Sequence, residues 1–252
     1  MCPFPVVAAY LRLGRKYEIE HLRTEALTAL SMAFPSTCDG FLALSDNGQS
    51  SIAPYPALLF DVIALAREIG KLDILPAAYF SYCRSYQIDE ILGGIEREDG
   101  TLSVLSAEDQ KSLLRGWHAL VDNLNGQSLY WILEDAELEC GKQACDLARK
   151  TVFLNLFTCR YPRPDISISV SKWDVKWEKD LCKHCRIACA RLHKQGSYVK
   201  WSQLPEMFDL PDWGDLTGEL VYGAWSSSHQ RNTLDFLLLI FILARSSHDA
   251  SI

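Results

Sequence analysis

Four cysteines in two pairs are the residues whose types and spacing can do chemistry. Cys140 and Cys145 form the first pair, and Cys182 and Cys185 form the second as a C-x-x-C motif. Zinc is held by thiolates at tetrahedral positions, with Zn–S distances of about 2.3 Å. Four protein thiolates leave no ligand position open for substrate or water. The spacing therefore predicts one structural zinc ion bound by these four residues, joining two segments of the chain.

Two other interpretations of the same thiols stay open. One apolar helix stripe, with residues three to four apart, also contains Cys182, Cys185, Cys189 and Leu192, and cysteine is a common small hydrophobe in cores. The other is a redox-active C-x-x-C, although no βαβ pattern surrounds it. His184 and His193 are substitute ligands by type, but we expect both at the surface.

No catalytic motif accompanies the cysteines. The sequence contains no G-x-S-x-G, H-E-x-x-H or P-loop pattern, so we predict that the protein is not an enzyme. Gly93-Gly94 is not followed by Lys-Ser/Thr and is expected to be a turn. An acidic run is expected to be a solvated helix face: Glu134, Asp135, Glu137 and Glu139.

Aromatic and basic residues gather around the second cysteine pair. The tryptophans are Trp173, Trp177, Trp201 and Trp213, and the basic residues are Arg186, Arg191, Lys194 and Lys200. We expect the tryptophans to form a small aromatic core, with a peptide-binding groove as the alternative. The formal net charge of −7 opposes nucleic-acid binding despite the local positive charge.

Two helical hairpins are predicted in the first part of the chain. Apolar residues at helical spacing over 6–33 indicate two helices separated by a polar turn at Gly14 to Glu18. Leu58 to Gly70 and Leu72 to Tyr86 form the second hairpin, with Gly70 as a C-terminal cap. Within residues 38–54, Asp46 to Ser51 is a loop by composition.

The second part of the chain is also predicted to be mainly helical. Ser106 is expected to cap a helix that continues to about Leu124. The further expectations are helix over Leu129 to Phe157 with an interruption at Cys140-Gly141, and a short strand over Ile166 to Val170. After these we expect helix over Lys179 to Gln195 closed by Gly196, and short helical turns from Trp201 to Leu220. The predicted fold class is therefore mainly α, with a small Cys-rich, zinc-like substructure.

Three regions follow from this pattern. They are helical hairpins at 6–92, a helical Cys- and Trp-rich region at 102–222, and a loosely attached tail at 223–252. In the tail, Phe236 to Ala244 is nine apolar residues long, whereas a membrane span takes about 20.

Composition indicates an ordinary globular protein. Of 252 residues, 48% are hydrophobic and 23% charged. The start, Met1 to Pro5, has neither a basic stretch nor a long apolar stretch, so we predict no secretory signal. Nine cysteines, an odd number, then favour reduced thiols in a cytoplasmic or nuclear protein.

Several long segments resemble one protein family. They are Leu11 to Ile19 (LRLGRKYEI), His21 to Leu27 (HLRTEAL), Phe34-Pro35, Pro56 to Pro76 (PALLFDVIALAREIGKLDILP), Leu181 to Cys185 (LCKHC) and Trp201 to Trp213 (WSQLPEMFDLPDW). Together they resemble the BTB/POZ-domain proteins of mushroom-forming fungi over roughly residues 6–216. The tail after Tyr222 does not match the family pattern.

The resemblance implies a protein-interaction role. A BTB fold begins with a strand-rich core, and this chain resembles only its last helices and the helical region that follows. The surface for dimerisation and cullin binding is therefore expected to be largely missing. The resemblance implies a non-enzymatic interaction module, a truncated adaptor for ubiquitin ligation, with protein partners of unknown identity. The alternative function is a Cys-based redox protein or enzyme that uses Cys182 and Cys185.

Overall fold

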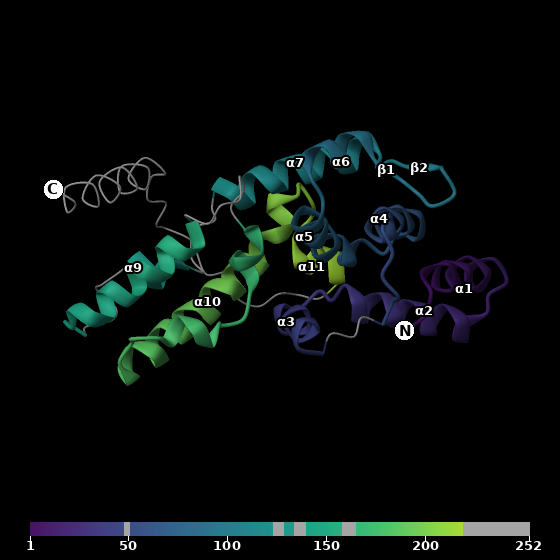
Figure 1. Ribbon diagram of the computed structural model, residues 1–252. Helices are drawn as coiled ribbons and strands as arrows, with labels where there is room; N and C mark the ends of the chain where they lie inside the picture. Colours follow the sequence, from purple (N-terminus) through teal and green to yellow (C-terminus); the bar gives the residue numbers. More distant parts are fainter. Residues whose placement is uncertain (48–50, 123–128, 134–139, 158–164, 219–252) are drawn as a thin grey trace. The chain divides into compact units, whose positions relative to one another are not determined.

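The protein folds mainly as α-helices, which confirms the predicted fold class. The computed structural model describes residues 1–47, 51–122, 129–133, 140–157 and 165–218 (Figure 1). All of them belong to one compact unit, Met1–Glu219. The predicted tail at 223–252 lies outside the described residues.

The first part of the chain forms the two predicted hairpins. Its elements are α1 (Phe4–Lys16), α2 (Glu20–Ala33), α3 (Cys38–Asn47), α4 (Leu58–Ile69), the 3-10 helix η1 (Leu72–Ile74) and α5 (Leu75–Ser85). Helix α1 packs against α2, and α4 packs against α5. Gly70 ends α4 with φ 74°, a left-handed conformation that glycine adopts without steric cost. The turn predicted at Gly14 to Glu18 falls partly inside α1, because that helix continues to Lys16.

Helix α3 occupies the first part of residues 38–54 and continues to Asn47, two residues into the loop predicted from Asp46 to Ser51. The Gly40 backbone N–H donates to Thr37 Oγ1 at 3.2 Å, which caps the start of the helix. Phe41 is buried, with its ring centroid 4.8 Å from that of Trp201 and 5.5 Å from that of Phe80. This packing outweighs the loop-forming composition of the residues that follow.

The middle of the chain contains the two strands among the described residues. Helix α6 (Ile88–Gly93) leads into β1 (Ile95–Glu96), which pairs antiparallel with β2 (Leu102–Ser103). Gly94 adopts φ 78° at the predicted turn between helix and strand. Helix α7 (Ala107–Asp122) begins at the predicted cap, since the Asp109 N–H donates to Ser106 Oγ at 3.1 Å.

The last described part is built around one long helix. Its elements are α8 (Tyr130–Leu133), α9 (Gln143–Phe157), the 3-10 helices η3 (Ile166–Val170) and η4 (Val175–Glu178), α10 (Lys183–Met207) and α11 (Trp213–Thr217). Helix α10 packs against α3, α5, α7, α8 and η3. Elements on both sides of the predicted division near residues 92–102 therefore contact α10.

The strand predicted over Ile166 to Val170 is wrong, because these residues form η3. The Asp165 carboxylate accepts the Ser167 backbone N–H at 2.9 Å, and Ser169 Oγ donates to the Ile166 carbonyl at 2.7 Å. These local hydrogen bonds satisfy the backbone without a partner strand. Ser169 is fully buried as well, so its side chain does not alternate to a solvated face.

The end of the helix predicted at Gly196 is also wrong. Helix α10 begins at Lys183, later than predicted, and passes through Gly196 to Met207. Gly196 and Ser197 are buried, and Ser197 Oγ donates to the Ser171 carbonyl at 3.2 Å. Packing at these small residues outweighs the helix penalty of glycine, which is about 1 kcal/mol. The turns predicted from Trp201 onward are consequently the end of α10, followed by α11.

Candidate metal centre

The four predicted cysteines come together at one point. Their sulfur atoms all lie within 4.8 Å of one another. Cys140 Sγ is 3.6 Å from Cys182 Sγ and 3.7 Å from Cys145 Sγ. Tetrahedral ligands at Zn–S distances of about 2.3 Å lie about 3.8 Å from each other, whereas the sulfurs of a disulfide are about 2.05 Å apart. The four free thiols are therefore spaced to hold one metal ion.

Two helix N-termini position these sulfurs. Cys145 is the third residue of α9, and Cys185 is the third residue of α10. Cys182 is the residue that caps α10, and Cys140 lies just before α9. The positive end of each helix dipole therefore points toward the sulfur cluster, and this favours thiolates over thiols.

A backbone turn stands beside each pair. Gly141 adopts φ 61°, and Asp180 adopts φ 65° two residues before Cys182. Both values are left-handed conformations, which glycine reaches freely and aspartate more readily than most residues. The Gly141 turn lets the chain fold back from Cys140 into α9. The Asp180 turn leads into α10.

Backbone N–H groups donate to two of the sulfurs. The Cys182 N–H donates to Cys145 Sγ at 3.3 Å. The hydrogen bond from the Cys185 backbone N–H, helped by the neighbouring thiols, lowers the pKa of Cys182 to about 6. Burial, followed by contacts with the neighbouring thiols, raises the pKa of Cys185. One negative charge is thus stabilised in the cluster, and a divalent cation would supply the charge needed to deprotonate the other thiols.

Burial divides the cluster into an inner and an outer half. Cys145 is 3% exposed and Cys185 is 1% exposed, whereas Cys140 and Cys182 are partly exposed. The two inner thiols alone fit the interpretation of cysteines as buried hydrophobes. That interpretation does not explain why two further thiols converge on them.

From the sequence, Arg149 is not identified as a residue near the cysteine cluster, and Cys189 is assigned only to an apolar helix stripe. Both lie four residues beyond a ligand candidate, Arg149 after Cys145 and Cys189 after Cys185, so helical spacing was the available signal. Arg149 is 4% exposed, and it donates to the Trp131 carbonyl at 3.3 Å. Burial raises the pKa of Cys189 to about 11, and the nearby Arg149 charge partly opposes this rise. Arg149 thus brings positive charge near the cluster.

The two histidines differ from each other. His184 is exposed, as predicted. His193 is fully buried, so its predicted surface position is wrong. Its Nε2 lies 3.0 Å from the Ser171 carbonyl, and its ring packs against Trp173 and Trp177. Because α10 continues past Gly196, the face that carries His193 is covered along its length.

The tryptophans form two aromatic clusters. Trp173 and Trp177 pack with Trp131, at centroid distances of 4.9 and 5.7 Å. Trp201 stacks on Trp213 at 5.6 Å. Trp131 is fully buried. No sequence motif surrounds it, so the sequence did not indicate that it joins this cluster.

The basic residues do not form one surface patch. Lys200 is only 2% exposed, and burial lowers its pKa to about 8. Arg186 Nε donates to the Leu181 carbonyl at 2.9 Å, which holds the segment that enters α10. The acidic run at 134–139 lies outside the described residues.

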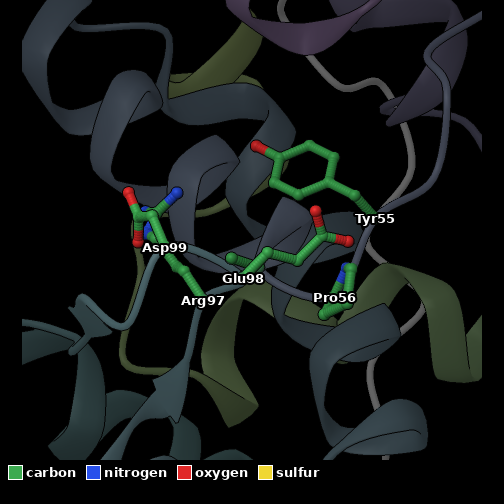
Figure 2. A pocket seen from close by; sticks show the side chains of 6 residues that line it. Tyr55, Pro56, Arg97, Glu98 and Asp99 are labelled. Carbon is green, nitrogen blue, oxygen red and sulfur yellow. The ribbon is translucent and has the colours of Figure 1, made fainter.

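A polar pocket of about 320 Å³ lies away from the cysteines, beside β1 (Figure 2). It is lined by Tyr55, Pro56, Ala57, Arg97, Glu98 and Asp99. Arg97 Nη1 donates to Asp61 Oδ2 at 3.0 Å, and Tyr55 Oη donates to the same oxygen at 2.6 Å. These polar groups already hold one another, so the pocket points to no particular chemistry.

No family model, curated protein or solved structure matches this chain. Among the described helices, no single one is long and apolar enough to cross a membrane, although α2 and Cys38–Leu44, bent by 80°, pass that test as a pair.

Proposed function

We propose that this chain binds one Zn²⁺ through Cys140, Cys145, Cys182 and Cys185, as the structural metal of a non-enzymatic protein-interaction module. The observation that carries the zinc site is the approach of four sulfurs to within 4.8 Å of one another. They come from two segments 37 residues apart, counted from Cys145 to Cys182. Soft thiolate ligands in a tetrahedral set suit zinc or an iron–sulfur centre. Zinc is preferred because four thiolates at this spacing complete its coordination.

The metal has a structural role because the protein supplies all four ligands. It joins the start of α9 to the start of α10, and α10 packs against helices from the rest of the described chain. Metal binding therefore adds directly to the free energy of folding. Arg149, one helical turn beyond Cys145, is ion-paired with Asp146 at 3.2 Å and holds the Trp131 carbonyl, so it fixes the start of α9.

The interaction role is supported by the lack of catalytic motifs and by the resemblance to BTB/POZ-domain proteins. Leu147 and Leu154 lie two helical turns apart on α9 and are 65% and 47% exposed. Burying these two side chains against a partner would remove apolar surface from water, which favours association. In this proposal the metal holds α9 in place so that the face can be presented to a protein partner. An adaptor in ubiquitin ligation is the specific form of the proposal.

Metal content is the first test. Protein purified in the presence of zinc should contain one zinc per chain by elemental analysis. Cys185→Ser should lose most of that zinc, whereas Cys83→Ser should keep it, because Cys83 is buried outside the cysteine cluster. A strong chelator should lower the melting temperature of the wild type. Protein that contains no metal, and whose melting temperature does not change with the chelator, would refute the site. Iron found in place of zinc would keep the site and change the identity of its metal.

Affinity capture followed by mass spectrometry tests the interaction role. The full chain should recover a specific protein partner, and Leu147→Glu/Leu154→Glu should lose it while keeping its zinc. Recovery of a cullin would support the ubiquitin-ligase form. A failure to recover one, under conditions in which a full-length BTB protein does so, would remove that form.

A redox protein is the second candidate function, and the position of the C-x-x-C pair favours it, because Cys182 caps α10 and Cys185 lies in its first turn. A low-pKa thiol at a helix N-terminus is typical of dithiol oxidoreductases. Such a protein should reduce a disulfide substrate catalytically when dithiothreitol is supplied. If Cys182→Ser abolishes turnover in metal-free protein, the redox function replaces the structural one.

A further inference from the structure

Cys140 is the sulfur that connects the two cysteine pairs. Its Sγ atom lies 3.6 Å from Cys182 Sγ and 3.7 Å from Cys145 Sγ. Oxidation of the cluster therefore has two partners available for Cys140. One partner, Cys145, lies five residues further along the same short segment, and the other, Cys182, is the residue that caps α10.

Access distinguishes these partners. Cys140 and Cys182 are partly exposed, whereas Cys145 and Cys185 are 3% and 1% exposed. A small oxidant from solvent therefore meets the sulfurs of Cys140 and Cys182 first. Cys145 Sγ is additionally held by the Cys182 backbone N–H at 3.3 Å.

We propose that Cys140 and Cys182 are the site at which peroxide oxidises this protein, and that the disulfide they form displaces the metal. This inference rests on the zinc site proposed above. It adds a covalent modification that the structural role of zinc does not require.

The chemistry balances with one hydrogen peroxide. One thiolate attacks a peroxide oxygen, the O–O bond breaks, and a sulfenic acid forms as hydroxide leaves. The second thiolate attacks the sulfenic sulfur, the S–S bond forms, and a second hydroxide leaves. Two thiolates are oxidised by two electrons, and peroxide is reduced to two hydroxides. Zinc then keeps only the thiolates of Cys145 and Cys185, and it is released.

The backbone permits the closure. The two sulfurs must approach from 3.6 Å to about 2.05 Å. Gly141, next to Cys140, has open space around it, since a Cβ built there meets no atom within 4 Å. Rotation about the Gly141 backbone can therefore bring Cys140 Sγ toward Cys182 Sγ without a Cβ clash at this glycine.

The choice of partner decides what the oxidised protein keeps. A Cys140–Cys182 bond joins the segment before α9 to the first turn of α10, as the metal does. A Cys182–Cys185 bond lies within one helical turn and joins no separate elements. We therefore expect peroxide-treated protein to lose zinc and yet melt at a higher temperature than chelator-treated, reduced protein.

The experiment uses the full chain after its zinc content has been measured. Hydrogen peroxide is added in the presence of a chromogenic zinc indicator, and disulfides are mapped by differential alkylation and mass spectrometry. We expect one zinc released for each Cys140–Cys182 disulfide, with dithiothreitol and added zinc restoring the starting state. Cys140→Ser should lose this cross-link, and Cys83→Ser should behave as the wild type.

Other outcomes separate the two proposals. A first disulfide between Cys182 and Cys185, or between Cys140 and Cys145, would overturn the inference while leaving the zinc site intact. So would zinc retention after the Cys140–Cys182 bond has formed. Protein that never contained zinc would overturn the release step together with the zinc site, and the disulfide map of the wild type would still decide the pairing.

Discussion

Lys200 places an ammonium group in the interior of the described fold. Its side chain lies on α10, the residue is 2% exposed, and burial lowers its pKa from 10.5 to about 8. In the unfolded chain the pKa returns to 10.5. Between pH 8 and 10.5 the unfolded state therefore binds more protons than the folded state, so this group makes stability rise with pH. Below pH 8 both states are charged, and the full cost of burial remains.

Replacing Lys200 by methionine should stabilise the protein at neutral pH. A pKa difference of this size corresponds to about 3 kcal/mol at most, and methionine keeps most of the side-chain volume. The gain in the free energy of unfolding should be largest at pH 7 and shrink as pH rises from about 8 to about 10.5. Urea unfolding at several pH values measures it.

The exposed Lys194 provides the control for this experiment. Lys194→Met should change the free energy of unfolding by less than about 0.5 kcal/mol at every pH. A gain for Lys200→Met that stays constant from pH 7 to 10.5 would show that charge burial is not its cause.

At the scale of elements, α7 and the end of α10 meet at a glycine. A Cβ built on Gly116 would lie 2.0 Å from the Phe208 ring, and Phe208 is itself fully buried. Gly116→Ala should therefore destabilise the protein by about 1–3 kcal/mol through overpacking, as measured by urea unfolding.

Gly93→Ala is the matched control, because a Cβ there meets nothing within 4 Å. Gly93 lies at the end of α6, where alanine should be neutral or slightly stabilising. Equal effects of the two substitutions would contradict the packing explanation.

The sequence predicts elements best where local chemistry decides them. The caps at Gly70 and Ser106, and the break at Cys140-Gly141 before α9, follow from residues a few positions apart. The convergence of the two cysteine pairs follows from what a tetrahedral ion requires of its ligands, and the sulfur positions agree with it.

The errors on α10 have one cause, which is burial by elements distant in the chain, whereas the strand predicted over Ile166 to Val170 is wrong because local hydrogen bonds form η3 there. The prediction that the helix ends at Gly196 concealed a stripe of buried residues on one face of α10. Its members are Cys189, His193, Ser197, Lys200 and Leu204. Extended past the glycine, helical spacing alone places His193 and Lys200 on this inner face. Local composition also says little of how far α3 extends, since the helix is held by Phe41 against Trp201, whose place no local pattern reveals.

At the scale of the whole molecule, the zinc site should control a part of the fold and not all of it. Chelation should reduce hydrogen-exchange protection in α9 and the first turns of α10, because the metal joins them. Protection in α4 and α5 should change little, since their shared core includes Phe60 packed on Tyr82 at 5.0 Å. Exchange read by mass spectrometry, with and without chelator, makes the comparison, and a uniform loss of protection would show that the whole unit unfolds with the metal.

The separation of the two cysteine pairs along the chain has a consequence in polymer physics. An ion that ties Cys145 to Cys182 closes a ring with a separation of 37 residues, and a permanent cross-link over such a ring removes about 4 kcal/mol of entropy from the unfolded chain. Ring entropy grows only logarithmically, so doubling the length would change this figure by about 0.6 kcal/mol. Ring entropy therefore depends little on the length of the chain between the pairs, and it is the packing of α9 and η3 that constrains this chain. The spacing within each pair is instead fixed by the size of a single ion.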